Sequence, residues 1–273
     1  MIADVVRVLR CPTCTLELEA GDGRLVCANG HSFDIARAGY VNLMPSAARG
    51  RHEGDSADMV AARERFLGAG HYEPLARALR ERVPRSAAHV LDVGAGTGYY
   101  LRDMPGAAVA LDASRYAAQR AARAHPRAGA VVCDVWRELP LRNACIPVAL
   151  NVFAPRNGPE LRRVLTSNGI LLVVTPKAEH LRELAGVIGL LQVDELKEQR
   201  LLAELEPHFD AADREPVDFE LRLERSDAQD LVQMGPSARH LGASDLDAGL
   251  GSTSWPLKVT AAMDLWTFIP NAR

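Results

Sequence analysis

The segment HVLDVGAGTGYYL, His89–Leu101, decides the fold because it joins a short apolar run to a loop dense in glycine. The apolar run, Val90–Val93, is interrupted only by Asp92, and we expect a buried strand there. The glycines after it are spaced G-x-G-x-G, which differs from the dinucleotide pattern G-x-G-x-x-G. Glycine permits positive φ and lets a ligand approach the backbone closely. The segment therefore predicts a strand, a tight turn and a ligand-binding loop made by Gly94, Gly96 and Gly98.

A second apolar run, in AVALDAS, ends at Asp112, 20 residues after Asp92. A carboxylate at the end of such a strand can accept hydrogen bonds from both hydroxyls of a ribose. A strand, a glycine loop, a helix and a strand ending in an acid together resemble the S-adenosylmethionine (SAM) site of Rossmann-like methyltransferases. Two alternatives stay open at this point: another nucleotide ligand, and a glycine turn that binds nothing.

Three further apolar runs, with helical stretches between them, indicate an α/β protein with a doubly wound sheet. They are Ala130–Cys133, Pro147–Phe153 and Gly169–Thr175. Ligands of such sheets bind beyond the carboxyl ends of the strands. The candidate site therefore includes the residues that follow these strands, namely Asp134, residues 151–155 and residues 175–180.

The N-terminal stretch CPTCTLELEAGDGRLVCANGHSFD, residues 11–34, has the spacing of a metal site. Two short loops that each present two ligands can surround a tetrahedral Zn²⁺. All four positions are filled by protein, so the ion would be structural and would not activate water. The alternative, unrelated buried cysteines, does not explain the two close pairs, Cys11-x2-Cys14 and Cys27-x3-His31.

These features predict a Rossmann-like SAM-dependent methyltransferase fold with a small N-terminal zinc-binding domain. We expect a zinc-binding module over residues 1–44, a linker over 45–55 and a methyltransferase domain over 56–273. The methyltransferase domain would begin with a helix capped by Asp58 and broken at Gly68 and Gly70.

Composition limits the classes of function. The chain has 273 residues, 48% hydrophobic and 25% charged, as expected of an ordinary globular protein. Neither an apolar run of about 18 residues nor a secretory signal is recognisable, so we expect no membrane partner and a cytoplasmic location. The net charge of −3 argues against a uniformly basic nucleic-acid binder. Residues 115–163 nevertheless hold nine arginines against three acids, a weak indication of RNA binding.

With both sites in place, the whole chain resembles the 23S ribosomal RNA (guanine-N1)-methyltransferases. Several short motifs carry the resemblance in this order: FDIARAGYVNLMP, GDSADMVAARERFLGAGHYEPL, VLDVGAGTGYY, LDAS, FAP, TPKAEHLREL and QMGPSARH. The form MGPSARH is more similar to the Gram-positive branch, which includes the tylosin-resistance methyltransferase.

The resemblance implies roles for individual residues. Cys11, Cys14, Cys27 and His31 match the zinc ligands of the family. Tyr72, Gly96, Thr97 and His180 match the residues with which the family contacts SAM. We add Gly94, because it belongs to the glycine loop, and Asp112, because it lies at a strand end. Two alternatives remain: Tyr72 could simply pack in the core, and His180 could cap a helix or lie on the surface.

The resemblance also implies a substrate, a hairpin loop of 23S rRNA near the macrolide-binding part of the exit tunnel, and a homodimer. Guanine N1 carries a proton that must leave, so a base or an orienting polar group is expected. Asp134 and Asn151 are the candidates for this catalytic role, and Arg7, Arg10, Arg24 and Arg37 are the expected phosphate contacts of the zinc module. The rival functions are a small-molecule methyltransferase and a zinc-knuckle RNA-binding protein without enzyme activity.

Overall fold

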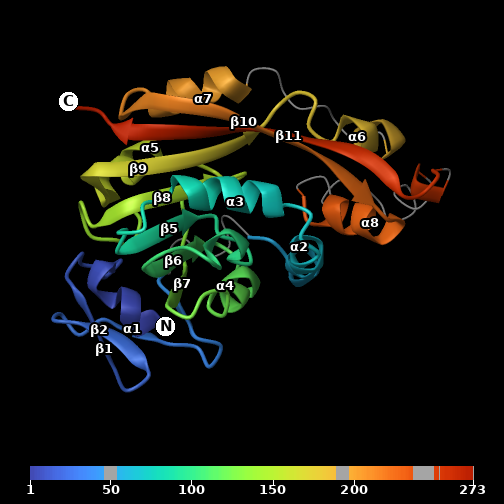
Figure 1. Ribbon diagram of the computed structural model, residues 1–273. Helices are drawn as coiled ribbons and strands as arrows, with labels where there is room; N and C mark the ends of the chain where they lie inside the picture. Colours follow the sequence, from blue (N-terminus) through green and yellow to red (C-terminus); the bar gives the residue numbers. More distant parts are fainter. Residues whose placement is uncertain (46–53, 189–196, 236–248, 252, 273) are drawn as a thin grey trace.

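The computed structural model describes residues 1–45, 54–188, 197–235, 249–251 and 253–272. Within these residues the chain forms one eight-stranded sheet flanked by helices, with a small three-stranded sheet at its N-terminal end (Figure 1). The strand order of the large sheet is β10-β11-β9-β8-β5-β6-β7-β4. The strands of this sheet are β4 (Tyr40–Asn42), β5 (His89–Val93), β6 (Ala107–Asp112), β7 (Ala128–Val132), β8 (Ile146–Val152), β9 (Leu165–Pro176), β10 (Phe209–Leu223) and β11 (Leu257–Pro270).

Strands β4 to β9 of the large sheet run parallel, as expected for an α/β protein. From β5 the chain adds β6 and β7 on one side and then returns to add β8 and β9 on the other. The order of strands therefore reverses between β5 and β8. Such a switch point opens a crevice at the carboxyl ends of the two strands, where ligands of doubly wound sheets bind.

Helices cover both faces of the sheet. Because successive side chains of a strand point to opposite faces, a strand can contribute to the hydrophobic clusters on both. Along β5, Val90 packs into one hydrophobic cluster and Leu91 into the other. The helices are α2 (Ala57–Gly68), α3 (Glu73–Arg82), α4 (Arg115–Ala121), α5 (Gly158–Val164), α6 (Arg182–Ile188), α7 (Lys197–Leu205) and α8 (Arg225–Gln233), with a 3-10 turn η3 (Tyr99–Leu101). The predicted α/β class and doubly wound sheet are confirmed, and in the described ranges no helix is long and apolar enough to cross a bilayer.

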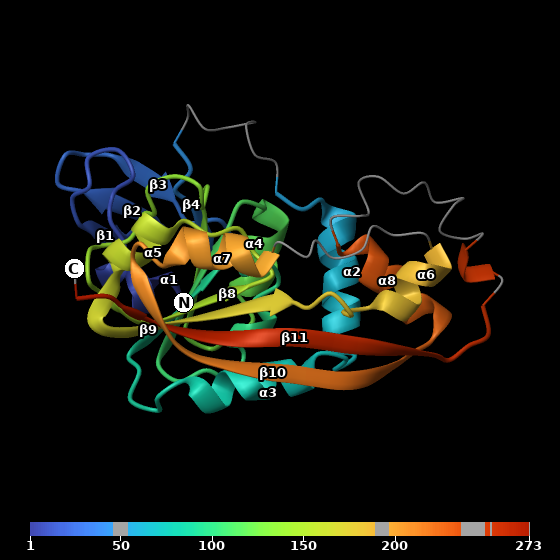
Figure 2. The same cartoon turned by 90° about the horizontal axis from the view of Figure 1, so that it is seen from above.

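The long antiparallel pair β10 and β11 forms one edge of the sheet (Figure 2). β11 also pairs antiparallel with β9, so the parallel sheet ends at β9. Most residues of β10 are exposed, which hides the strand from a search for apolar runs. No strand was predicted here from the sequence.

The N-terminal segment is built onto the other edge of the sheet. It contains α1 (Ile2–Val5), η1 (Val6–Val8), β1 (Leu18–Gly21), β2 (Arg24–Cys27) and β3 (Ser32–Asp34). The next strand, β4, pairs in parallel with β7 of the large sheet. From α1, Val5 packs so closely on Gly129 of β7 that a Cβ on that glycine would overlap its side chain.

The residues on the two sides of the predicted boundary at residue 44 therefore share one hydrophobic core. Cys11 and Leu25 belong to the same buried cluster as Leu91 of the central strand. Most of the predicted linker, residues 46–53, lies outside the described residues. So does most of the QMGPSARH motif, from residue 236 onward.

Helix α2 begins one residue after Ser56, whose Oγ accepts a hydrogen bond from the backbone N–H of Met59 at 3.3 Å. The cap is therefore Ser56, and the prediction of Asp58 was wrong, because Asp58 already lies in the first turn. The predicted break is confirmed, since α2 ends at Gly68 and α3 starts at Glu73.

Candidate active site and metal site

The glycine loop lies at the switch point, directly after β5. Gly94, Gly96 and Gly98 have φ values of +80°, +53° and +76°, a region that side chains with a Cβ rarely adopt. A Cβ on Gly98 would also lie 2.8 Å from that of Ala124, and one on Gly94 would overlap Ala154. The loop therefore needs glycine for its conformation and for the close approach of the segment after β8.

Asp112, at the end of β6, is tied to this loop. Its Oδ2 accepts a hydrogen bond from Gly96 N at 2.8 Å, and its Oδ1 accepts one from Ser114 N, also at 2.8 Å. Burial raises the pKa of this carboxyl, although the two backbone hydrogen bonds oppose the shift. Each oxygen keeps a further lone pair that a ribose hydroxyl can use.

Asp92 lies on β5, just before the loop, and is 1% exposed. Among the described residues, neither carboxyl oxygen has a hydrogen-bond partner, and Oδ1 of Asn151 on β8 lacks one as well. Burial, together with the negative charge of Asp112, raises the pKa of Asp92 to about 8. Burying a carboxyl group without hydrogen-bond partners costs free energy, unless a cationic donor binds to it. SAM carries an ammonium and a sulfonium, so these orphaned acceptors fit that cofactor.

Arg63 of α2 places its guanidinium over the loop. Its Nη1 would lie 3.3 Å from a Cβ on Gly96. The guanidinium pairs with Asp55 and donates from Nη2 to the carbonyl oxygen of Met234 at 2.7 Å. Arg63 therefore brings a positive charge to the glycine loop, next to which the carboxyl groups of Asp92 and Asp112 also lie.

Tyr72, His180 and Phe153 form a group of rings next to the loop. Ring centroids are 6.2 Å apart for Tyr72 and Phe153, and 6.0 Å apart for Phe153 and His180. His180 Nδ1 accepts a hydrogen bond from Ala262 N at 3.2 Å, so the neutral ring carries its proton on Nε2, 3.4 Å from the Tyr72 hydroxyl. Burial raises the pKa of Tyr72, which keeps its hydroxyl protonated.

The two predicted catalytic residues lie on different strands. Asp134 follows β7 and Asn151 is on β8, three strand spacings apart in the sheet order, which is about 14 Å. Asp134 accepts a hydrogen bond at Oδ1 from Trp136 N at 3.0 Å, and its Oδ2 lies 3.5 Å from Nε of Arg137. The buried amide of Asn151 donates to Val93 O at 3.3 Å and to Pro155 O at 2.9 Å. The two side chains therefore do not converge on one reacting atom.

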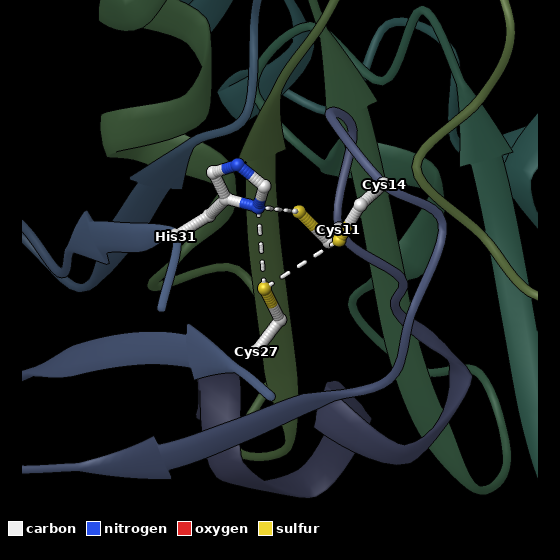
Figure 3. Close-up of side chains that lie close together, drawn as sticks. All are labelled: Cys11, Cys14, Cys27 and His31. Atoms are coloured by element: carbon white, nitrogen blue, oxygen red, sulfur yellow. Dashed lines mark hydrogen bonds between the residues drawn. The ribbon is translucent and has the colours of Figure 1, made fainter. Parts of the chain in front are cut away.

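The metal-type residues do converge. The four ligand atoms of Cys11, Cys14, Cys27 and His31 all lie within 4.8 Å of one another (Figure 3). Cys14 Sγ lies 3.6 Å from Cys27 Sγ, and His31 Nδ1 lies 3.6 Å and 3.4 Å from the sulfurs of Cys11 and Cys27. A tetrahedron with Zn–S bonds of about 2.3 Å and Zn–N bonds of about 2.0 Å has edges of about 3.5–3.8 Å. The four residues thus fit one structural zinc ion.

Of the four arginines predicted to contact phosphate, Arg10 is unsuitable. It is buried, pairs with Glu138 and belongs to the joint between the zinc module and the loop after β7. Arg7, Arg24 and Arg37 are exposed. The arginine-rich stretch 115–163 is also largely neutralised, because six of its nine arginines pair with carboxylates: Arg120, Arg127, Arg137, Arg142, Arg156 and Arg163.

Two residues of the site, Asp92 and Arg63, were not recognised from sequence. Asp92 interrupts an apolar run, and this could have marked it, because a buried strand seldom carries an acid without a reason. Arg63 lies on an exposed helical pattern with other arginines and gave no signal. Phe153 lies within residues 151–155 of the predicted site, but no role was predicted for its side chain, and only the structure reveals that its ring is exposed.

The glycine loop at the switch point, the two strand-end acids and the closed Cys3His site define a class, a SAM-dependent methyltransferase with a zinc ribbon. Residues 9–50 match a family model described as RlmA, N-terminal. A solved SAM-dependent methyltransferase from Aquifex aeolicus overlaps with a TM-score of 0.49 at 12% identity, covering 79% of this chain and 99% of that one.

Curated relatives extend over nearly the whole chain. A putative 23S rRNA (guanine-N1)-methyltransferase of Micromonospora griseorubida is 47% identical, covering 99% of this chain and 100% of the relative. The 23S rRNA (guanine(748)-N1)-methyltransferase of Streptomyces fradiae is 46% identical, covering 90% of this chain and 91% of that protein. The chain belongs to the 23S rRNA (guanine-N1)-methyltransferase family, so the resemblance inferred from its motifs is confirmed.

Proposed function

We propose that the protein transfers the methyl group of SAM to N1 of a guanine in a hairpin loop of 23S rRNA. The observation that carries this proposal is the orphaned Asp92 carboxyl behind the glycine loop, in a chain whose relatives of similar length are named for that reaction. The guanine at position 748, which the Streptomyces fradiae relative carries in its name, is the first candidate.

The chain's own residues would hold the cofactor along the carboxyl ends of three neighbouring strands. Asp92 on β5 would accept the ammonium, Asp112 on β6 would accept the ribose hydroxyls, and Asp134 beyond β7 would face the adenine. Bound SAM supplies an electrophilic methyl on its sulfonium. Gly94, Gly96 and Thr97 would lie beneath the cofactor, and Tyr72 and His180 would border the methionine end.

In this arrangement Asp134 lies on the far side of the ribose from the methyl, which favours cofactor binding over proton removal from N1. Asn151 would be a positioning residue, because its amide ties Val93 at the end of β5 to Pro155 in the loop after β8. If Asp134 were the base instead, Asp134→Asn would flatten the pH profile of kcat. We expect it to weaken SAM binding and leave that profile unchanged.

The zinc module would supply contacts to RNA that a bare methyltransferase domain lacks. Arg10 N donates to Pro140 O at 3.0 Å and Arg142 N donates to Val8 O at 2.9 Å, so the module holds the loop that follows β7. Its exposed Arg7, Arg24 and Arg37 can then reach phosphates around the hairpin. Replacing these three should weaken RNA binding and reduce its salt dependence.

The test of the proposed reaction is methyl transfer from labelled SAM to unmodified 23S rRNA, with a mixture of small-molecule acceptors as the comparison. Incorporation into rRNA alone supports the proposal. Label in a small molecule alone would favour the rival small-molecule methyltransferase, and SAM binding without transfer to any acceptor would favour the rival RNA-binding protein.

Three further points rest on the proposed reaction. An enzyme that modifies ribosomal RNA works where ribosomes are assembled, which places it in the cytoplasm. A methyl group near the macrolide-binding part of the tunnel would lower sensitivity to tylosin-type macrolides, measurable as the inhibitory concentration with and without the gene. The homodimer implied by the resemblance remains a prediction, and light scattering of the purified protein tests it.

A further inference from the structure

Phe153 presents an exposed aromatic ring at the switch point. It follows β8 directly, its side chain belongs to a residue 43% exposed, and its neighbour Ala154 packs on Gly94 of the glycine loop. The ring is therefore next to the cofactor loop and open to solvent. What sets this exposed ring apart is its place at the carboxyl ends of the central strands, where ligands of doubly wound sheets bind.

The backbone of Phe153 is held in an unfavourable conformation. Its φ is +53°, a left-handed value that costs free energy for a residue with a bulky side chain. Two hydrogen bonds hold the segment in place: Phe153 N donates to Val174 O at 3.3 Å, and Asn151 Nδ2 donates to Pro155 O at 2.9 Å. The surrounding segment thus fixes the direction in which the ring points.

Two other rings are neighbours of Phe153. His180 is inclined to it by 30° and Tyr72 by 56°. Tyr72 is 3% exposed and is itself packed edge-on against Phe66 and Phe219, with centroids 5.3 Å and 6.1 Å away. The Phe153 ring therefore has a neighbour that is anchored in the core, while the residue itself stays accessible.

A nucleobase is a chemical group that fits such a platform beside a methyl donor, because every base has a flat face that can stack on an aromatic ring. A guanine in a hairpin loop must leave its stack before its Watson-Crick edge can reach the cofactor. Stacking on an aromatic side chain compensates the lost base stacking, and it works without hydrogen bonds to the base.

We propose that Phe153 stacks on the target guanine and holds it in the crevice, an inference that rests on the proposed function. Phe153→Leu keeps an apolar side chain of similar size but removes the aromatic face. We expect it to lower kcat/KM for the RNA about tenfold to hundredfold, the range for loss of one base–aromatic stack. Phe153→Trp restores an aromatic face and should retain activity within a few-fold.

The decisive comparison uses the full chain and a hairpin RNA in two forms, with the guanine and with an abasic site in its place. If Phe153 stacks on that base, Phe153→Leu weakens binding of the guanine RNA but not of the abasic RNA. The affinity for S-adenosylhomocysteine should change less than twofold in the same variant, and its thermal melting reports whether it is folded.

Two results would overturn the inference. If Phe153→Leu lowered the affinity for both RNAs equally, the ring would contact something other than the base. If it lowered the affinity for S-adenosylhomocysteine to the same extent, the ring would contact the cofactor. Failure of the wild-type protein to methylate any guanine is a separate outcome, which refutes the proposed function itself. In that case the RNA-binding comparison still decides whether Phe153 meets a base.

Discussion

Replacing Asp92 by asparagine should stabilise the ligand-free protein and weaken its cofactor binding. The folded state raises the pKa of this carboxyl from 3.8 to about 8. At pH 7 the unfolded chain carries it ionised and the folded chain carries it protonated, which costs about 4 kcal/mol of stability, at 1.36 kcal/mol per pH unit. An asparagine side chain would avoid this cost, but its amide would lack partners in turn, a penalty of about 1–3 kcal/mol. The expected net gain for Asp92→Asn at pH 7 is therefore about 1–3 kcal/mol.

The sign of the pH dependence follows from the direction of the shift. Because the folded state binds the extra proton between the two pKa values, the contribution of Asp92 to wild-type stability is most favourable below about pH 4 and falls as the pH rises to about 8. The variant lacks this contribution. The difference in free energy of unfolding between the two should grow by about 1.4 kcal/mol per pH unit between pH 5 and pH 8.

Urea denaturation at pH 5, 6, 7 and 8 measures this difference, and Asp22→Asn in an exposed turn controls for the loss of one negative charge. In parallel, calorimetry should report weaker binding of S-adenosylhomocysteine by about tenfold or more, since a hydrogen bond between charged groups is lost. Binding to the wild type at pH 7 should also release a proton. A difference that does not vary with pH, combined with unchanged affinity, would refute the account of Asp92.

Three other predictions follow from single contacts. Gly129→Ala should lower the free energy of unfolding, measured by urea denaturation, by about 1–3 kcal/mol, because the new Cβ would overlap Val5 and displace the N-terminal segment from the sheet. Gly21→Ala is the control, since Gly21 has open space around it and its replacement should leave the free energy of unfolding unchanged. Elemental analysis should find one zinc ion per chain in the wild type and none in Cys14→Ser, whose melting temperature should also be lower. Full zinc content in the variant would contradict the four-ligand site. We expect the Arg63 guanidinium, which lies over Gly96, to pair with the carboxylate of the cofactor. Arg63→Ala should therefore weaken binding of S-adenosylhomocysteine about tenfold but leave binding of 5′-methylthioadenosine, which lacks the amino-acid part, unaffected. Equal losses for both ligands would rule out this contact.

The sequence was most informative where chemistry depends on spacing along the chain. The pairs Cys11–Cys14 and Cys27–His31 predicted a tetrahedral cluster, and the structure brings all four ligand atoms together. The glycine spacing likewise predicted a loop at a strand end, and its positive φ values bear out that reading. In both cases a few neighbouring residues contain the whole pattern.

Features that depend on distant contacts were not predictable in this way. Arg10 was read as a phosphate contact, but it is buried against the loop after β7, 128 residues away in sequence from its partner Glu138. The residues of β7 that pair with β4 lie 90 positions downstream, as Ala130 does from Tyr40, so a linear division into modules separates elements that share one sheet. Asp134 follows one parallel strand, β7, and Asn151 lies near the end of another, β8. Only the order of the strands shows that the glycine loop lies between these two residues.

Methyl transfer to N1 of one guanine is tested most directly by primer extension on 23S rRNA treated with the purified protein and SAM. N1-methylguanine cannot form a Watson-Crick pair, so we expect one new stop, at a guanine in a hairpin loop, with position 748 examined first. The stop should be absent when SAM is omitted. If the protein binds SAM but produces no stop in 23S rRNA, the proposed reaction is wrong.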